Sequence, residues 1–353
     1  MKKIFLTTIA LLSIVSASVF GMYGVDSGWI DFLTHGNQFR ARLDQLGFTL
    51  GNDTIKGTFG FNNNAGYGGV YGDLLSTANG GITYDFKPSI SMGLGYTSSL
   101  ISVGVGYNAT IGTGYKDNGK SYNPVAHTPV LVLNAMDNAF RMAIPIQVYA
   151  DGNTNAVSVD SQFRYYTGLD MFPEIRLYLR YGSFTTKTGG VTSKEGESFG
   201  FDFRLYFGSM VEEVALKPYV KLVYNGALGK YHDNTRVEAV KVMKKQQSGS
   251  PIIFAKNAWI LNLVAGLGLS ANSDIVSLYL EPSLGLKVNQ AGSADKNAKE
   301  TYGLGYDVYA EIYITPLKNL EWYFEASIGN LDANTKGVSF ASSTGITWYL
   351  PAL

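Results

Sequence analysis

The stretch Ser198–Ser209 reads Ser-Phe-Gly-Phe-Asp-Phe-Arg-Leu-Tyr-Phe-Gly-Ser. Because successive side chains of a β-strand point to opposite faces, phenylalanine and leucine would fill one face over the range Phe199–Phe207. The other face carries Asp202 and Arg204, charges that a protein core does not accept without compensation. The pattern predicts a strand with an apolar environment on one side and water on the other, as in the wall of a transmembrane β-barrel.

The same alternation recurs along most of the chain. The apolar positions of four further segments are Phe140, Met142, Ile144, Ile146 and Val148; Ile175, Leu177, Leu179 and Tyr181; Leu304, Tyr306, Val308, Ala310, Ile312 and Ile314; and Leu320, Trp322, Phe324, Ala326 and Ile328. Tilted membrane strands need about 9–11 residues, and most of these segments have that length. We predict strands near residues 38–50, 54–62, 82–87, 90–97, 100–110, 127–135, 138–150, 155–166, 174–186, 198–208, 214–226, 257–270, 274–288, 301–314, 319–329 and 337–350. The fold class is therefore all-β, a transmembrane antiparallel barrel of about sixteen strands.

The lengths of the connections give a first test of this topology. With both termini in the periplasm, even-numbered connections should be short turns and odd-numbered ones outer loops. From the fourth predicted strand onward the connections mostly follow this rule, but the run 61–81 is long where a short turn is expected. Either a pair of strands is missed there or the first hairpin is misread. The apolar residues between Phe39 and Leu50 also fit a helical spacing, so the topology of residues 22–81 stays open.

The N-terminus has the composition of a cleaved secretory signal peptide. Lysines at positions 2 and 3 precede an apolar run that ends at Val15, and small residues follow. Cleavage fits after Ser18 or after Gly21, and we favour Gly21, which gives a signal peptide, 1–21, and an outer-membrane barrel, 22–353. The alternative is a transmembrane anchor, but the apolar run is too short and lacks a basic flank after it.

Composition excludes several classes of protein. The 353 residues contain no cysteine, so barrel closure rather than disulfides would have to stabilise an exported fold. The 28 basic and 28 acidic residues balance to zero net charge, which argues against a nucleic-acid partner. Beyond the signal peptide, no apolar stretch has the length of a membrane helix. A soluble β-sandwich also alternates, but it explains neither the signal peptide nor the rhythm of hairpins.

The sequence carries no recognisable catalytic motif. The three histidines, His35, His127 and His232, have neither the spacing of a zinc site nor a His-Glu-x-x-His motif. A barrel hydrolase would need a serine such as Ser121 or Ser248 beside a histidine, and nothing local indicates this arrangement. We therefore predict no enzyme activity, no cofactor and no metal site.

The predicted inner face carries two groups of charge. The basic group lies on the seventh to eleventh predicted strands and consists of Arg141, Arg164, Arg176, Arg180, Arg204, Lys217 and Lys221. The acidic group lies on the thirteenth to fifteenth predicted strands and consists of Glu281, Asp307, Glu311, Glu321 and Glu325. As opposed walls, the two groups would set a transverse field across a water-filled lumen, which suits the passage of polar solutes.

An alternative is that these charges pair across a narrow or plugged interior, because Asp160 and Asp202 stand beside the basic group. Barrels of about sixteen strands leave an aqueous channel, whereas eight-stranded barrels are filled by side chains. On the predicted strand count, we favour a pore that conducts small hydrophilic solutes.

The longest predicted connection, Ala227–Lys256, is basic. Its loop candidates are Lys230, Arg236, Lys241, Lys244 and Lys245, and its acidic residues are Asp233 and Glu238. Three interpretations fit: a constriction that folds into the lumen and favours anions, a solvated surface loop that carries antigenic variation, and an adhesin loop that binds acidic host glycans. We favour the surface loop.

The residues after the signal peptide form a characteristic pattern. It comprises Met22-Tyr23-Gly24, Trp29-Ile30-Asp31-Phe32-Leu33-Thr34-His35-Gly36-Asn37-Gln38-Phe39-Arg40-Ala41-Arg42, Asp44-Gln45-Leu46-Gly47-Phe48 and Gly57-Thr58-Phe59-Gly60-Phe61. This pattern resembles the variable surface protein (Vsp) family of intestinal spirochaetes. The resemblance implies an outer-membrane antigen with variable surface loops and multimeric complexes, and it supplies no catalytic residue and no ligand.

From residues and resemblance we expect a surface-exposed outer-membrane barrel that is a major variable antigen and a porin-like diffusion channel. The alternative is an adhesin or structural coat protein whose barrel only anchors surface loops. The expected partners are outer-membrane lipid, paralogous or identical copies, host surface ligands, and the barrel-assembly machinery, which reads an amphipathic last strand. Here that strand carries Trp348 near its end, although Pro351, Ala352 and Leu353 follow.

Overall fold

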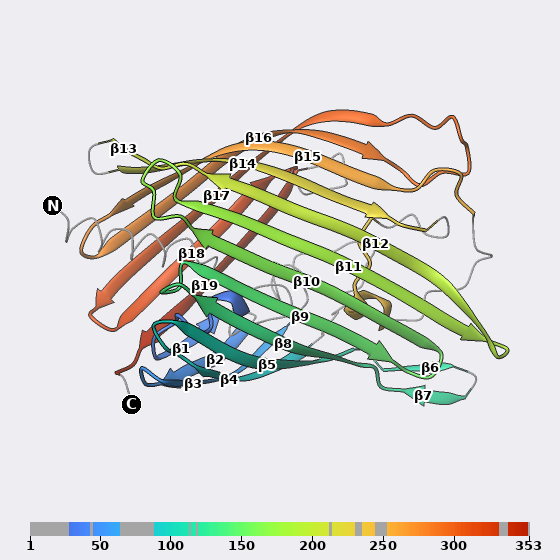
Figure 1. Cartoon of the computed structure of the whole chain (residues 1–353), viewed down its shortest axis with the longest axis horizontal. Coiled ribbons are helices and arrows are strands. Elements are labelled where there is room, and N and C mark those ends of the chain that lie inside the picture. The colour runs from blue at the N-terminus through green and yellow to red at the C-terminus, as the bar shows by residue number, and fades with distance from the viewer. Residues whose placement is uncertain are drawn as a thin grey trace, which may run out of the picture.

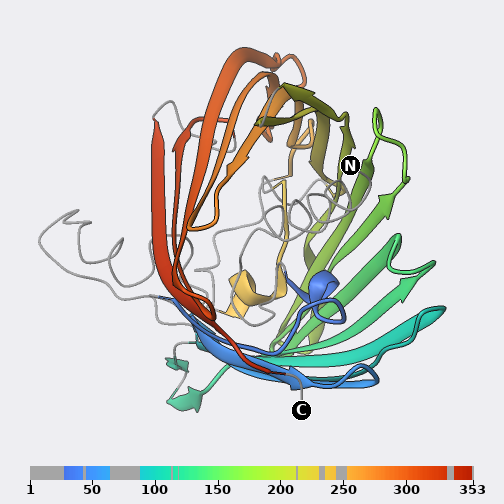
Figure 2. The same cartoon turned by 90° about the vertical axis from the view of Figure 1, so that its left-hand side faces the viewer.

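Sixteen antiparallel strands close into a barrel in the computed structural model, which confirms the predicted fold class. The structure describes residues 28–42, 45–63, 88–112, 114–117, 119–211, 214–229, 235–243, 253–331 and 338–351. The ring closes where β1 (Gln38–Arg42) pairs with β19 (Ser339–Tyr349), from Gln38↔Tyr349 to Arg42↔Gly345 (Figure 2). Closure satisfies the backbone hydrogen bonds of both edge strands, as a membrane requires.

The strands follow one another around the ring in sequence order (Figure 1). Between β1 and β19 they are β2 (Gln45–Gly51), β3 (Ile55–Asn63), β4 (Pro88–Tyr96), β5 (Ile101–Ile111), β8 (Val125–Ala135), β9 (Phe140–Ala150), β10 (Thr154–Tyr166), β11 (Glu174–Thr188), β12 (Val191–Tyr206), β14 (Val214–Ala227), β15 (Trp259–Asn272), β16 (Val276–Gln290), β17 (Thr301–Leu317) and β18 (Leu320–Gly329). A short strand, β13 (Ser209–Val211), pairs with β14 beyond the end of β12, and β6 (Tyr115–Asp117) pairs with β7 (Lys120–Tyr122) in a separate hairpin.

The first hairpin differs from the prediction. The sequence analysis expects one strand over 38–50, whereas the structure has two, β1 and β2, paired from Gln38↔Thr49 to Arg42↔Gln45. The more exposed residues are odd-numbered in β1 and even-numbered in β2. Because side chains alternate with a period of two, such a change of phase marks a turn. The helical alternative for this segment is also wrong.

Splitting this strand removes the exception at 61–81. β3 ends and β4 begins at the end of the barrel where the long connections β5–β8 and β14–β15 also join their strands, and 24 residues of sequence, 64–87, separate the two strands. The other end, on the left in Figure 1, carries short turns such as 273–275 and 318–319. In outer-membrane barrels the short turns face the periplasm. The predicted strand 82–87 falls outside the described residues.

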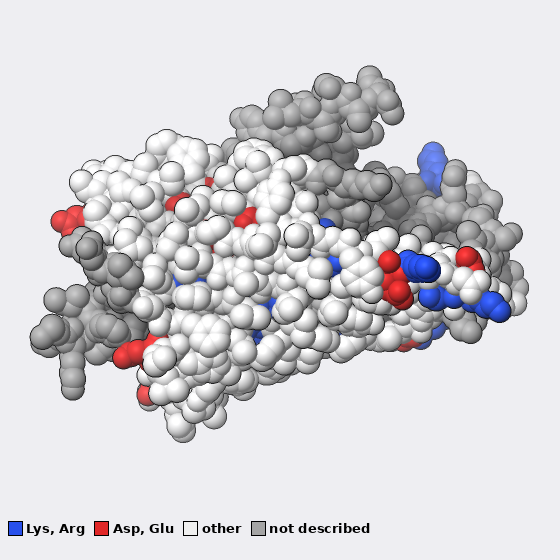
Figure 3. Space-filling view, turned by 90° about the horizontal axis from the view of Figure 1, so that it is seen from above, with Lys and Arg blue, Asp and Glu red and all other residues white. Residues whose placement is uncertain are grey.

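The outer face of the barrel is apolar and the inner face is polar. On β12, Phe199 and Phe203 are exposed on the outside, whereas Asp202 is 2% exposed. Figure 3 shows one side of the barrel, where charged side chains are sparse over the wall and more prominent towards its two ends. Within the described part of the chain, no helix is long and apolar enough to cross a membrane.

A charge on the outer face is expected to destabilise the barrel. Phe324 is exposed in the middle of β18. Phe324→Arg would place a guanidinium in lipid, so the free energy of unfolding should fall by roughly 2–4 kcal/mol. The control is Ser327→Arg on the opposite face of the same strand, which should cost much less. Equal losses for both variants, measured by urea unfolding in lipid vesicles, would contradict the assignment of faces.

Two short 3-10 helices lie inside the ring of strands (Figure 2). The first, η1 (Trp29–Asp31), precedes β1, and Trp29, Ile30 and the following Phe32 are at most 2% exposed. The second, η3 (Ala239–Met243), belongs to the connection between β14 and β15. The interior is therefore lined by two inward segments as well as by the strands.

Candidate functional site

A row of cations crosses five neighbouring strands on the inner face. It consists of Arg141 on β9, Arg164 on β10, Arg176 on β11, Arg204 on β12 and Lys221 on β14, each directly opposite the next. We call these five residues the basic ladder. Directly opposed side chains share a face, and like charges in such positions repel one another. The ladder therefore needs carboxylates close to it.

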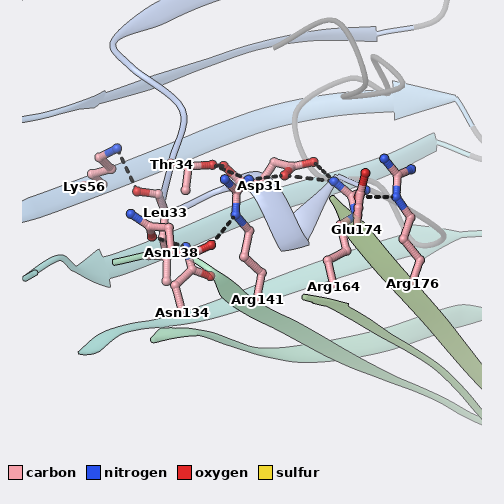
Figure 4. A network of polar contacts seen from close by, with 10 residues as sticks. All are labelled: Asp31, Leu33, Thr34, Lys56, Asn134, Asn138, Arg141, Arg164, Glu174 and Arg176. Atoms are coloured by element: carbon pink, nitrogen blue, oxygen red, sulfur yellow. Dashed lines mark hydrogen bonds and ion pairs between the residues drawn. The ribbon is translucent and has the colours of Figure 1, made fainter. Parts of the chain in front are cut away.

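The first carboxylate comes from the inward N-terminal segment (Figure 4). Asp31 of η1 accepts hydrogen bonds from Arg141 Nη1 at 2.9 Å and from Arg164 Nη1 at 3.0 and 3.1 Å. Thr34 Oγ1 lies 3.3 Å from the same nitrogen of Arg141. The side chains of Asp31, Arg141 and Arg164 are 7%, 12% and 7% exposed. One buried carboxylate thus joins the first two rungs of the ladder to η1.

Two further carboxylates stand on the ladder strands themselves. Glu174 accepts hydrogen bonds from Arg176 Nε and, at 2.6 Å, from Lys217 Nζ. Asp202 accepts from Arg204 Nη2 at 2.7 Å. Glu174 and Asp202 are 1% and 2% exposed. The basic wall is therefore partly neutralised from within, so the two walls are less strongly opposed than the sequence analysis expects.

Loss of the Glu174 charge is expected to be costly. Glu174→Gln would leave the buried Arg176 and the partly buried Lys217 without their carboxylate, and breaking a buried pair costs roughly 3–5 kcal/mol. The matched control is Glu197→Gln, because Glu197 pairs with Lys194 at 2.6 Å at the exposed end of β12. Exposed pairs contribute roughly 0–1 kcal/mol. Urea unfolding of both variants in lipid vesicles measures the difference, and equal losses would show that burial of the Glu174 pair does not matter.

Tyrosine rings pack against the cations of the ladder. The guanidinium of Arg176 lies 4.8 Å from the ring centre of Tyr206, and that of Arg141 lies 4.9 Å from the ring centre of Tyr166. Such cation–π contacts favour a fixed side-chain position over a freely moving one. The arginines are consequently held against the wall.

The acidic group gathers on β16 to β18. Glu311 lies directly opposite Glu325, and the two residues are 2% and 5% exposed. Arg42 of β1 forms an ion pair with Glu325, and the hydroxyl of Tyr313 donates to Glu311 at 3.1 Å. Two adjacent carboxylates repel each other, so the arginine and the phenol stabilise this wall.

The remaining predicted inner residues also have partners or neighbours. Arg180 contacts Asp160 at 3.2 Å, Lys221 lies 3.9 Å from Asp202, Glu281 accepts from Tyr219 at 2.8 Å, Glu321 accepts from Tyr349 at 3.1 Å, and Asp307 is opposite Gly329. The structure thus brings the basic residues together on β9 to β14 and the acidic residues together on β16 to β18. A role in lining a pore stays a prediction for all of them.

Part of the β14–β15 connection folds into the barrel, so a solvated surface loop is the wrong interpretation for this part. The amide of Val237 donates to Ser198 Oγ at 2.7 Å. The amide of Val240 donates to Gln147 Oε1 at 2.6 Å. Val237 and Ala239 are at most 4% exposed and pack against aromatic side chains of the inner wall. This part of the connection folds inward because its apolar residues, such as Val237 and Ala239, are buried against the wall.

The loop candidates are distributed accordingly. Arg236 contacts Asp160 at 2.9 Å and Glu238 at 2.7 Å, inside the barrel. Lys241 belongs to η3, but its side chain is not described. The other candidates, Lys230, Lys244 and Lys245, lie outside the described residues.

The sequence analysis does not include three charged residues of the site, Glu174, Arg42 and Asp31, among its candidates. Glu174 has the same phase as Arg176, so strict alternation on β11 would have found it. Arg42 was hidden by the misread first hairpin. Asp31 precedes the first strand, where no periodicity places a side chain. A contact between η1 and the far strands β9 and β10 has no local sequence signal.

The two histidines in the described part of the chain lie in different segments. His127 forms a hydrogen bond through Nδ1 with the hydroxyl of Tyr107, and both residues belong to barrel strands. His35 follows η1, whereas His232 and Ser248 fall outside the described residues. Among the residues that can be placed, no three metal-binding side chains gather.

A model of the Serpulina hyodysenteriae variable surface protein matches residues 2–349, nearly the whole chain. The chain belongs to this family. The resemblance found in the sequence is confirmed, and the protein is an outer-membrane β-barrel of the variable surface proteins. No curated protein matches it.

Solved structures of outer-membrane proteins are similar to this chain at low identity. A bacterial polysaccharide outer membrane secretin is 9% identical, with a TM-score of 0.46 over 87% of this chain and 91% of that one. The outer membrane channel DcaP of Acinetobacter baumannii is 8% identical, with a TM-score of 0.38 over 92% and 99%. A loop-deletion mutant of OmpT from Vibrio cholerae is 9% identical, with a TM-score of 0.38 over 89% and 97%. These values are too low to inform the function of this chain.

Proposed function

We propose that this variable surface protein is a porin-like pore that lets small hydrophilic solutes cross the outer membrane. The observation that carries the proposal is the chemistry of the inner face, which is lined by the basic ladder and the acidic group. Ion pairs and phenols of this kind need water or each other, whereas an interior filled by apolar packing would exclude them. A ring of sixteen strands is wide enough to leave an aqueous channel.

The segment 235–243 is proposed as the constriction of this pore. It is bonded to the wall through Val237 and Val240, and it carries Arg236 and Glu238 into the lumen. Arg236 and Arg180 both contact Asp160, so cationic and anionic groups meet where the cross-section narrows. Charges close to a permeating solute orient its dipole and compete with its hydration.

Passage of neutral solutes tests the proposal. Liposomes that contain the folded chain from Met22 should swell in isotonic solutions of small sugars and amino acids, and the rate should fall as solute size increases. Liposomes with the same amount of heat-denatured protein are the control. Equal swelling rates for the two preparations would contradict the pore.

The role of a variable antigen is the second part of the proposal. The family to which the chain belongs is that of a variable surface protein, and the β11–β12 hairpin extends the barrel wall at the long-loop end (Figure 1). Gly189 and Gly190 form its tip with φ values of 59° and 85°. An epitope tag inserted between them should bind antibody on intact cells. Binding only after permeabilisation would overturn the surface orientation.

A further inference from the structure

The inner wall beneath η1 is built around glycines. Four glycines form two directly opposed pairs there, Gly93↔Gly106 and Gly95↔Gly104, on β4 and β5. A Cβ atom at any of these four positions would crowd the side chains that follow Gly28 on η1 and just after it. The inner wall therefore has no side chains at these four positions, and the N-terminal segment lies against its backbone.

Apolar contacts complete this seat. Trp29, Ile30, Phe32 and Leu33 form one buried cluster with three wall residues, Val130, Val132 and Ala143. The rings of Trp29 and Phe32 meet edge to face with centroids 5.6 Å apart. An aqueous lumen has no need of an apolar wall, so the glycines and the valines are explained by the segment that they receive.

Ion pairs hold η1 on the side that faces β9 and β10. Asp31 contacts Arg141 and Arg164 of the basic ladder at 2.9–3.1 Å. Arg164 is 6% exposed, and its Nε is buried without an acceptor among the described residues. The arginine pair therefore has a hydrogen-bond donor that Asp31 does not use, although buried donors are normally satisfied.

The surroundings of the pair favour anions. The basic ladder and Lys217 contribute six cations, whereas the carboxylates within contact of them are Asp31, Glu174 and Asp202. Arg176, directly opposite Arg164, is already paired with Glu174. A carboxylate that enters the lumen is consequently attracted to this wall, where the Nε of Arg164 is a buried donor without an acceptor among the described residues.

We propose that Arg141 and Arg164 form a binding site for small carboxylate solutes, and that Asp31 of the same chain occupies this site in the resting barrel. A solute carboxylate would form the same charge-assisted hydrogen bonds and reach the spare Nε of Arg164. By taking the place of Asp31, it releases η1 from its seat and widens the short-turn end of the lumen. This inference rests on the proposed pore and names a solute class for it.

The tethered Asp31 competes with any free solute. An attached group has an effective concentration in the millimolar range, so millimolar carboxylate is needed to displace it. Asp31→Asn removes the competing charge but keeps the size of the side chain. We expect the apparent affinity for succinate to rise about tenfold or more in this variant.

Accessibility of η1 tests the site directly. The chain has no cysteine, so Ile30→Cys introduces a single thiol at a position that is 0% exposed. A neutral maleimide should label it only when η1 leaves its seat. The labelling rate of the folded chain is measured as sodium succinate replaces sodium chloride at constant ionic strength. We expect a saturable rise of severalfold.

Three variants complete the experiment. In the Arg164→Gln background, basal labelling should be fast and independent of succinate. Lys194→Gln removes one positive charge at the exposed end of β12 and should leave the succinate response intact. If Ile30→Cys does not fold, Leu33→Cys, which is 3% exposed in the native chain, provides the same measurement.

The outcomes separate this inference from the pore itself. A labelling rate that is the same in chloride and succinate, or a response that persists in Arg164→Gln, overturns the carboxylate site. Labelling does not require conduction. A barrel that conducts but shows no succinate response therefore contradicts the site alone, and a succinate response in a barrel that never conducts contradicts the pore alone.

Discussion

Deletion of residues 237–247 is expected to raise the single-channel conductance severalfold. This part of the β14–β15 connection includes η3, which lies inside the ring of strands and is bonded to the inner wall. Without it the lumen loses its constriction, whereas the strands that form the wall are unchanged. Enough of the connection remains to join β14 to β15. Conductance in a planar bilayer gives the readout.

A second deletion serves as the control. Residues 294–297, in the connection between β16 and β17, are exposed at the long-loop end, and their removal should leave the conductance unchanged. Equal conductance of the native chain and the 237–247 deletion would show that η3 does not limit flow. A fall in binding to acidic host glycans, with no change in conductance, would instead favour the adhesin.

Gly106→Val is expected to release η1 and to raise the conductance at the same time. A Cβ atom on Gly106 would overlap the indole ring of Trp29, which is 2% exposed and packed on the wall. Overpacking of this kind costs roughly 1–3 kcal/mol, which the barrel can avoid by expelling η1 rather than by unfolding. The summed emission of the four tryptophans should then shift to longer wavelength, because the Trp29 ring enters water.

The matched control for this change is Gly303→Val on β17. A Cβ atom on Gly303 meets no atom within 4 Å, so the substitution adds the same side chain to a strand without a clash. Its conductance and fluorescence should equal those of the native chain. Unchanged tryptophan emission in Gly106→Val would mean that η1 stays in its seat, and the four glycines of β4 and β5 would then not decide its position.

Much of the barrel could be predicted because its signal is local. Apolar and polar side chains alternate along each strand, and the alternation can be recognised within a single stretch such as 198–208. The predicted number of strands equals the number in the barrel, although the individual strands differ in part. One predicted strand, 38–50, is two strands, while the predicted strand 82–87 falls outside the described residues.

The inner segments could not be predicted in the same way. The alternation on β9 to β14 places the basic residues on one face, but it does not say which carboxylates meet them. Asp31 reaches Arg164 across 133 positions of sequence, and its docking depends on glycines of β4 and β5. The inward fold of Arg236 was likewise hidden, because a run of lysines around it resembles a solvated loop. Contacts of this kind follow from closure of the barrel and not from any periodicity.

Single-channel recording of the folded chain in a planar bilayer is the most direct test of the pore. The folded state is first verified by β structure and by resistance to heat in detergent. We predict discrete, stable conductance steps, with a reversal potential under a salt gradient that reports whether the basic or the acidic wall dominates. A heat-resistant barrel that inserts into the bilayer and never conducts would contradict the pore.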